Sequence, residues 1–359
     1  EAIPEDWRQA LEWEKSQLPE VLDAHTQQVI EGISIRAMKL HNERECWLMD
    51  APEPLRQHLA AIHGPLVASL AKEVGYSEED VEFCKDFQQG FEAIGVTPHS
   101  DHFSAPCDKS MPVMTEEELL ALRRPSNERI IQSLKEDEHS QFMHEMTEKD
   151  LGRGWMSAPE QLQDWMVTGL LMSRRLAVVE HRSHVAGGWR FRLVDDLSES
   201  FVNSAAGGDY KIVSQGLDTL KAMAFCMLMV GMHFDIWKAD VAGAFRTCVY
   251  KYAHWPLMAV VYLLMGVPMV ACHRRMALGG VTSVYAWHRV AGFILSVVVR
   301  KGCCVAARYV DDFFGIRRKG CRVQALQLLE AVCFFCGWPL GPEKSKHSML
   351  AMVLLGCKV

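Results

Sequence analysis

The sequence predicts a mixed α/β protein, and three stretches carry that prediction. Residues 303–316 place two apolar runs on either side of Asp311 and Asp312, a pattern typical of a β-hairpin. The stretch that ends at Asp240 alternates as a strand does. Residues 5–75 repeat apolar side chains at helical spacing. Hydrophobic residues make up 49% of the 359-residue chain, which is enough for a substantial core.

The first 150 residues predict an acidic, mainly helical module. They hold 31 acidic and 14 basic residues, a net charge of −17. Ser77 and Thr115 precede acidic residues in the manner of helix caps, and Pro125 is expected to open a further helix. Residues 94–113 contain several prolines and predict a loop. We expect this part to be a separate module or an accessory surface.

The remaining residues, 151–359, are basic, with 14 acidic and 24 basic residues and a net charge of +10. Such a balance around acidic motifs is expected of an enzyme that handles a polyanion. Residues 176–179 and 189–194 predict a β-hairpin crowded with arginines. Guanidinium pairs well with phosphate oxygens, although an ordinary basic surface ribbon is the alternative. Residues 217–232 are almost wholly apolar and predict a buried helix that leads to the Asp240 strand.

Further along, residues 257–276 predict a pair of buried strands, and residues 285–299 and 321–336 predict amphipathic helices. Residues 256–272 carry no charge and are long enough to span a membrane. Gly266 at their centre predicts a turn instead, so no membrane segment is expected. Twelve cysteines, several of them in apolar runs, indicate reduced thiols in an intracellular protein.

The predicted chemistry centres on Asp311 and Asp312. Adjacent carboxylates repel, and a hard cation such as Mg²⁺, which prefers oxygen ligands, relieves the repulsion. Aspartate is also common in turns, and the pair alone favours that interpretation. A third acid, Asp240, reverses it, because small residues (242–244) and then Phe245 follow it. This pattern suits a nucleotide pocket, since two-metal phosphoryl transfer needs a shared set of carboxylates.

These motifs resemble those of one enzyme family. Residues 240–245 (Asp-Val-Ala-Gly-Ala-Phe) and 309–312 (Tyr-Val-Asp-Asp, a YVDD motif) resemble the first and third palm motifs of reverse transcriptases. Their order and a separation of about 70 residues also fit. The chain is similar to the fingers and palm region of a retrotransposon or other retroelement reverse transcriptase, an RNA-directed DNA polymerase. The resemblance covers roughly residues 150–359.

The resemblance implies an α/β (α+β) right-hand polymerase fold. Residues 151–232 are then the fingers and residues 233–359 the palm, whose antiparallel sheet is a ferredoxin-like βαββαβ unit. The helical module, residues 1–150, precedes them. The palm is expected to end at the primer-grip strand, with thumb and RNase H regions absent.

The resemblance also implies the metal ligands. Asp240, Asp311 and the carbonyl oxygen of Val241 are expected to hold two Mg²⁺ ions, for which Mn²⁺ can substitute, and Asp312 assists them. Lys344 lies in a segment that resembles the fourth motif. It is the expected general acid for the pyrophosphate that leaves.

Further residues are implied for the substrates, which are dNTP, an RNA template and a DNA primer. The expected nucleotide-binding residues are Arg192, which falls on the triphosphate-contacting arginine, with Val241, Ala244, Phe245, Leu278 and Gly279. Phe245 is expected to lie under the sugar and exclude a 2′-hydroxyl. The expected nucleic-acid-binding residues are Arg182, Arg190, Tyr309, Arg317, Arg318 and Lys319. The chain is also expected to be part of a longer polyprotein.

Two alternatives stay open. A viral-type RNA-dependent RNA polymerase shares the palm, but such enzymes usually carry a polar residue at the position of Phe245 and glycine at that of Tyr309. A catalytically silent palm that serves as a nucleic-acid-binding scaffold is the second alternative. The intact acids argue against it, because a scaffold has no need of carboxylates that repel one another.

Overall fold

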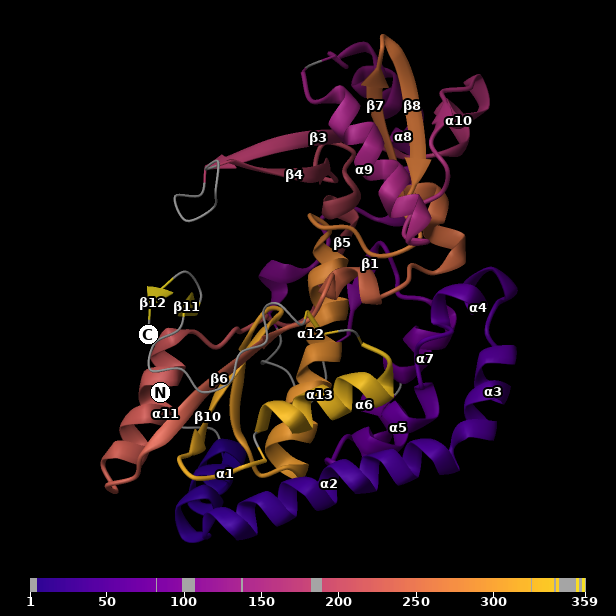
Figure 1. Cartoon of the computed structure of the whole chain (residues 1–359). Coiled ribbons are helices and arrows are strands. Elements are labelled where there is room, and N and C mark those ends of the chain that lie inside the picture. The colour runs from indigo at the N-terminus through magenta and orange to yellow at the C-terminus, as the bar shows by residue number, and fades with distance from the viewer. Residues whose placement is uncertain are drawn as a thin grey trace.

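The computed structural model describes residues 5–81, 83–98, 107–136, 138–181, 189–323, 325–338, 340–341, 353–354 and 357–358. Helices make up its N-terminal part, and helices and strands are mixed in the rest of the chain (Figure 1). Its α-helices are α1 (Glu5–Ser16), α2 (Pro19–Lys39), α3 (His41–Met49), α4 (Glu53–Leu59), α5 (Gly64–Glu73), α6 (Glu78–Val81), α7 (Phe83–Gln89), α8 (Glu116–Gln132), α9 (Ser140–Gly152), α10 (Asp164–Gly169), α11 (Leu217–Leu228), α12 (Val281–Ser296) and α13 (Ala325–Cys336).

The described strands form four sheets. They are β1 (Gly95–Thr97), β2 (Glu160–Gln161), β3 (Met172–His181), β4 (Trp189–Asp196), β5 (Ala206–Gly208), β6 (Phe234–Asp240), β7 (Ala259–Leu264), β8 (Val267–Cys272), β9 (Val305–Tyr309), β10 (Asp312–Arg318), β11 (Val353–Leu354) and β12 (Cys357–Lys358). The predicted hairpins around Asp311 and Gly266 and the predicted strand before Asp240 are confirmed.

The sheet that carries the acidic motifs is antiparallel, with strand order β6-β10-β9. With α12 and α13 it follows the order β-α-β-β-α, the first five elements of the predicted βαββαβ unit. Gly315 of β10 lies opposite Trp237 of β6, and a Cβ atom there would meet the indole ring at 2.7 Å. Glycine at this position therefore lets the two strands pair with the ring packed against them.

The second large sheet has the order β2-β8-β7-β3-β4. Its strands β2, β3 and β4 lie in the range predicted as fingers, whereas β7 and β8 come from the range predicted as palm. Its β3–β4 hairpin projects away from the body of the molecule, and α8 and α9 pack against β3 (Figure 1). Thr115 and Glu118 form the capping box of α8, so the predicted cap is confirmed. Pro125 does not open a new helix, because α8 continues through it.

The N-terminal helices share one core with the β6-β10-β9 sheet. Apolar side chains from α1, α2, α5 and α7 pack in the same cluster as those of β6, β9, β10, α12 and α13. The long helix α2 runs along the base of the molecule in contact with α13 (Figure 1). The apolar side of the acidic stretch is thus continuous with this sheet, and Glu14 and Asp150 of the same stretch are also buried.

A buried ion pair joins α1 to the β6-β10-β9 sheet. The Nη1 atom of Arg317 lies 3.1 Å from Oε2 of Glu14, and both side chains are almost fully buried. Arg317 also donates to the hydroxyl of Thr26, at 2.9 Å. Burial raises the pKa of Glu14, and the Arg317 charge opposes that rise. Arg317 was expected to meet nucleic acid, but this interior position is not that of a phosphate ligand.

Two apolar helices differ from their predictions. The helix α11 is only half-buried, because Phe225, Leu228 and Met229 are 58–68% exposed. The helix α12 is enclosed rather than amphipathic. In the described part of the chain, only Val281–Lys301 is long and apolar enough to cross a membrane. Of its most apolar window 67% is buried within the protein, the pattern of a core helix.

Removing the Glu14 carboxylate should destabilise the protein strongly. Glu14→Ala leaves Arg317 charged and buried without its anion, so we expect the free energy of unfolding to fall by about 3–5 kcal/mol. Equilibrium urea denaturation measures this. Glu12→Ala is the matched control, since it removes the same group from the exposed ion pair with Lys15 and should cost no more than about 0.5 kcal/mol. Equal losses in the two variants would contradict the interpretation.

Candidate active site

Two of the three predicted catalytic acids face each other across adjacent strands. Asp240 ends β6, Asp312 begins β10, and the two are directly paired in the antiparallel register. Residues paired in this way have Cβ atoms about 4.5–5.5 Å apart. Like charges at such positions repel, and Asp240 is only 7% exposed. The sheet therefore holds two carboxylates close together, in an environment that favours a cation.

Asp311 lies in the tight turn between β9 and β10. Val310, just before it, has φ of 56°, a conformation that costs a β-branched residue about 1–3 kcal/mol. The indole Nε1 of Trp287 donates a 3.0 Å hydrogen bond to the Val310 carbonyl oxygen, so α12 holds the turn from below. The Asp311 carbonyl oxygen accepts from the amide of Val241, at 3.4 Å. The sequence offered no signal for the role of Trp287.

The turn after Asp240 brings the small residues and Phe245 together. Val241 is buried and forms an antiparallel bridge with Leu340. Gly243 has φ of 60°, and a Cβ atom there would lie 3.4 Å from the Trp155 ring. A short 3₁₀ helix, Ala244–Thr247, follows. The Ala244 side chain is buried, and Phe245 is partly buried against the main core.

The glycine turn before α12 also has the predicted shape. Leu278 is exposed, and Gly279 has φ of 100°, which favours glycine. A Cβ atom at Gly279 would come within 3.1 Å of the Asp195 carbonyl oxygen, so this turn approaches the base of β4 closely. Asn203 clamps the turn, since its amide donates to the Gly279 oxygen and its Oδ1 accepts from the amide of Val281, both at 3.0 Å.

The other predicted residues occupy varied places. Arg192 lies on β4 opposite Val178, in the projecting hairpin, and Tyr309 is 44% exposed beside the acids. Arg318 is part-buried and donates to the carbonyl of Gln17. The remaining predictions are Lys319, which is exposed, Arg190, whose side chain is not described, and Arg182 and Lys344, which lie outside the described residues.

The fit to a metal ion rests on the chemistry of these ligands. Carboxylate and carbonyl oxygens are what Mg²⁺ prefers, and Asp240 and Asp312 are paired across the strands. Val241 and Asp311 adjoin these two in the chain and share a backbone hydrogen bond. Within the described ranges, however, no group of three or more His, Cys, Asp or Glu side chains is close enough together to hold a metal ion. The arrangement thus provides a paired carboxylate platform rather than a closed metal cage.

A buried polar chain lies next to this site. Arg175 makes two hydrogen bonds to the Asp195 carboxylate, at 2.8 and 3.1 Å, and His273 Nε2 lies 2.7 Å from the same group. On the other side of the imidazole, Arg246 Nη1 lies 2.8 Å from His273 Nδ1. Burial alone would raise the pKa of Asp195, but Arg175 and His273 hold it well below its usual range. Sequence reasoning saw Arg175 only as part of a basic hairpin.

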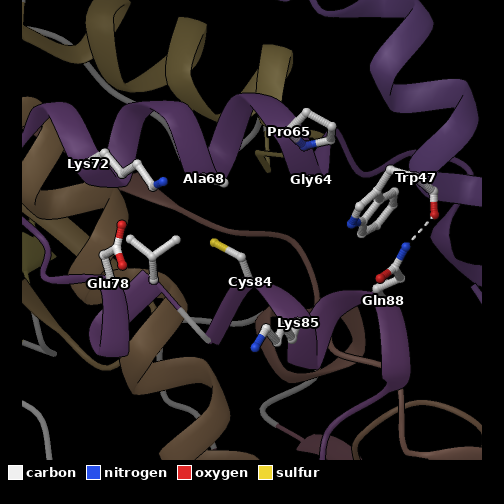
Figure 2. A pocket seen from close by; sticks show the side chains of 10 residues that line it. Trp47, Gly64, Pro65, Ala68, Lys72, Glu78, Cys84, Lys85 and Gln88 are labelled. Atoms are coloured by element: carbon white, nitrogen blue, oxygen red, sulfur yellow. Dashed lines mark hydrogen bonds between the residues drawn. The ribbon is translucent and has the colours of Figure 1, made fainter. Parts of the chain in front are cut away.

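A cavity of about 530 Å³ lies between α5 and α7, away from the acids (Figure 2). Trp47 closes one end, and its carbonyl oxygen accepts a 2.6 Å hydrogen bond from the Gln88 amide. A Cβ atom at Gly64 would clash with the Trp47 ring at 2.3 Å, so glycine admits the indole. The lining consists of Trp47, Gly64, Pro65, Ala68, Lys72, Glu78, Val81, Cys84, Lys85 and Gln88. It contains none of the predicted site residues.

No protein-family model matches the chain, and no curated protein matches it. Solved structures do show similarity. The protease-reverse transcriptase of prototype foamy virus is 15% identical, with a TM-score of 0.42 over 88% of this chain and 34% of that chain. The foamy viral protease-reverse transcriptase in complex with RNA/DNA hybrid is 11% identical, with a TM-score of 0.45 over 81% and 34%. The likeness is coarse, and this chain spans about a third of those proteins.

Lowering the pH should destabilise the fold through its buried histidines. Burial and neighbouring arginines lower the pKa of His58 and His273 to about 4 and that of His288 to about 3. Each stays neutral when folded but takes up a proton when unfolded below pH of about 6.5. The free energy of unfolding should therefore fall between pH 6.5 and 4, by up to about 1.4 kcal/mol per pH unit for each histidine.

Urea denaturation at a series of pH values from 7 to 4.5 measures this slope. His273→Gln should flatten the slope, because one of the histidines that the fold keeps neutral no longer titrates. His41→Gln serves as the control at an exposed position and should leave the slope unchanged. A wild-type stability that does not fall between pH 6.5 and 4.5 would show that these histidines are not held neutral.

Proposed function

We propose that this chain is the fingers and palm part of an RNA-directed DNA polymerase of a retroelement. The observation that carries the proposal is the cross-strand pairing of Asp240 with Asp312, with Asp311 in the turn beside them. Two strand-borne acids and a turn-borne acid, in the order of the reverse-transcriptase motifs, are the ligand set for nucleotidyl transfer from a dNTP to a primer 3′-hydroxyl. The partners are then an RNA template, a DNA primer and dNTP.

The carboxylates of Asp240 and Asp311 and the carbonyl oxygen of Val241 would hold two Mg²⁺ ions, with Asp312 in support. When bound, Mg²⁺ lowers the pKa of the attacking hydroxyl and neutralises phosphate charge. The chain itself positions the reactants, and positioning with charge stabilisation accounts for most of the rate in such reactions. The strained turn at Val310, held by Trp287, presents Asp311 at the end of the hairpin.

Other residues bind the nucleotide around these acids. Arg192, on the fingers hairpin, pairs with triphosphate oxygens through its planar guanidinium. The turn at Gly279 lets the backbone approach the base and sugar, because it has no side chain to interfere. Phe245 follows the buried Ala244 and would lie under the sugar, where its ring leaves no room for a 2′-hydroxyl.

Primer extension tests the proposal. With Mg²⁺, poly(rA)/oligo(dT) and dTTP, the wild type should extend the primer, and EDTA should abolish extension. Asp311→Asn removes a metal ligand and should lower kcat at least about 10³-fold, because the ions carry most of the charge stabilisation. Asp218→Asn removes a fully exposed carboxylate on α11 and should leave the rate unchanged.

The other outcomes of this assay are also decisive. Extension with UTP in place of dTTP would assign the chain to the RNA polymerases. Primer-template binding without extension, in a protein shown to be folded, would overturn the enzymatic proposal and favour a binding scaffold. An Asp311→Asn variant as active as the wild type would remove the metal site from Asp311.

Sugar discrimination provides a further test. Phe245→Val opens space under the ribose, so we expect the preference for dTTP over UTP to fall by about 10- to 100-fold, from roughly 1–3 kcal/mol of lost exclusion. Single-nucleotide incorporation measures the ratio of kcat/KM for the two substrates. Phe225→Val, on the exposed face of α11, is the matched control. An unchanged ratio in Phe245→Val would show that another group excludes the 2′-hydroxyl.

A further inference from the structure

We infer that Arg246 is a positioning residue that fixes the turn after Asp240 relative to the sheet that contains β3 and β4. It thereby sets the spacing of Phe245, Arg192 and Gly279, which line the proposed nucleotide-binding space, called the nucleotide slot below. The inference rests on the proposed function for the meaning of the slot. Arg246 directly follows Phe245 and belongs to the same 3₁₀ turn. Its side chain contacts Asp150 of α9 and His273, which directly follows β8.

Four contacts hold the Arg246 guanidinium. Its Nη1 atom lies 2.8 Å from His273 Nδ1 and donates to the Arg275 carbonyl oxygen at 3.2 Å. Its Nη2 atom lies 3.5 Å from Oδ2 of the buried Asp150, at the end of α9. The guanidinium carbon lies 5.5 Å from the centre of the Trp155 ring. A Cβ atom added at Gly243 would lie 3.4 Å from the same ring, so Arg246 and the Gly243 turn pack against one indole.

The imidazole of His273 connects the Arg246 guanidinium to the β3–β4 hairpin. Its Nδ1 faces the guanidinium, which can only donate, so Nδ1 accepts and Nε2 carries the proton. That Nε2 proton points at the Asp195 carboxylate 2.7 Å away. Asp195 in turn accepts both hydrogen bonds from Arg175, its direct partner across the β3–β4 ladder. The tautomer of His273 is thus set from both sides. Arg175 Nη2 also lies 3.5 Å from His273 Nε2, but its shorter hydrogen bond is to Asp195.

This hydrogen-bonded chain ends at Asp195, which lies close to two other residues of the nucleotide slot, Arg192 and Gly279. Asp195 lies three residues after Arg192 on β4, so it fixes the base of the strand that carries the triphosphate-binding arginine. The carbonyl oxygen of Asp195 is also the group that a Cβ atom at Gly279 would meet, at 3.1 Å. Phe245, Arg192 and Gly279 come from three distant segments, and the chain from Arg246 to Asp195 is the continuous polar link between them.

A merely stabilising role would not need these groups. Well-packed apolar residues often match a buried ionic network in stability, whereas ionic networks have been found to fix one arrangement of the parts they join. The Arg246 guanidinium is planar and its N–H donors point in fixed directions, so it fixes the orientation of its partners as well as their distance. Loss of the Arg246 guanidinium should therefore shift Phe245, under the sugar, relative to Arg192, at the triphosphate. This shift should be larger than the effect on folding.

Single-nucleotide incorporation by Arg246→Gln tests the inference. Because small misplacements of bound groups cost up to about 100-fold, we expect KM for dTTP to rise about 10-fold and the dTTP/UTP preference to fall about 10-fold. We expect kcat to change by less than about 3-fold, with primer-template affinity unchanged. Arg246→Lys keeps the charge without the fork and should recover only part of the preference.

Arg153→Gln is the matched control. Arg153 also lies over Trp155, at 4.7 Å, but its side chain is 44% exposed and has no contact with His273 among those described. It should leave KM and the dTTP/UTP preference unchanged. An unchanged preference in a folded Arg246→Gln protein, or an equal loss in Arg153→Gln, would overturn the inference.

Hydrogen exchange of the full chain provides a readout that does not depend on activity. Arg246→Gln should speed amide exchange in residues 241–247 and in residues 192–197 together, whereas Arg153→Gln should change neither segment. Faster exchange confined to residues 241–247 would overturn the inference even in an active enzyme. If the wild type extends no primer, the proposed function fails, and this exchange pattern still decides whether Arg246 couples the two segments.

Discussion

The candidate site depends above all on the register of one strand pair. Asp240 and Asp312 face each other because β6 and β10 pair as they do, and a slip of one residue would turn every side chain of one strand to the other face of the sheet. Three residues further along, Gly315 and Trp237 restrict that slip, since the indole lies where any other side chain would project. The sheet also packs its apolar face against α12 and α13, and this packing further restricts a slip of the strand register.

Strain in the acidic turn is supported by the same core. Val310 adopts a backbone conformation that is unfavourable for its side chain, and its carbonyl oxygen is satisfied by Trp287 from the enclosed helix α12. Residues held in this way persist only where surrounding packing determines their conformation. The position of the acids thus depends on the burial of α12. This helix supplies both the apolar contact and the indole N–H of Trp287 that donates to the turn.

Local patterns in the sequence predicted the elements that carry the acids. The hairpin around Asp311 and the strand before Asp240 each lie within a short stretch, and their pairing follows from apolar runs and turns. The burial of Arg317 could not be predicted, because its partner Glu14 lies 303 positions away. For the same reason the roles of Arg246 and Trp287 were missed, since they depend on contacts between segments that the chain brings together only on folding.

The exposure of α11 and the continuity of α8 through Pro125 were mispredicted for related reasons. Apolar composition alone does not say which neighbours a helix finds, and tertiary packing can outweigh the tendency of proline to end a helix. The resemblance to reverse transcriptases supplied roles for residues that pattern alone could not assign. It did not supply the hydrogen-bonded chain from Arg246 through His273 to Asp195, because that chain joins segments distant in the sequence.

The buried pair between Glu14 and Arg317 has a consequence for where this protein can be divided. A shortened protein that begins near residue 150, where the resemblance to reverse transcriptases starts, would keep Arg317 on β10, the central strand of its sheet, but lose the counter-charge. Such a fragment would also uncover the face of α13 against which α2 packs. The smallest independently folding unit that contains the acids should therefore include α1, so the motif-bearing region is not an autonomous domain.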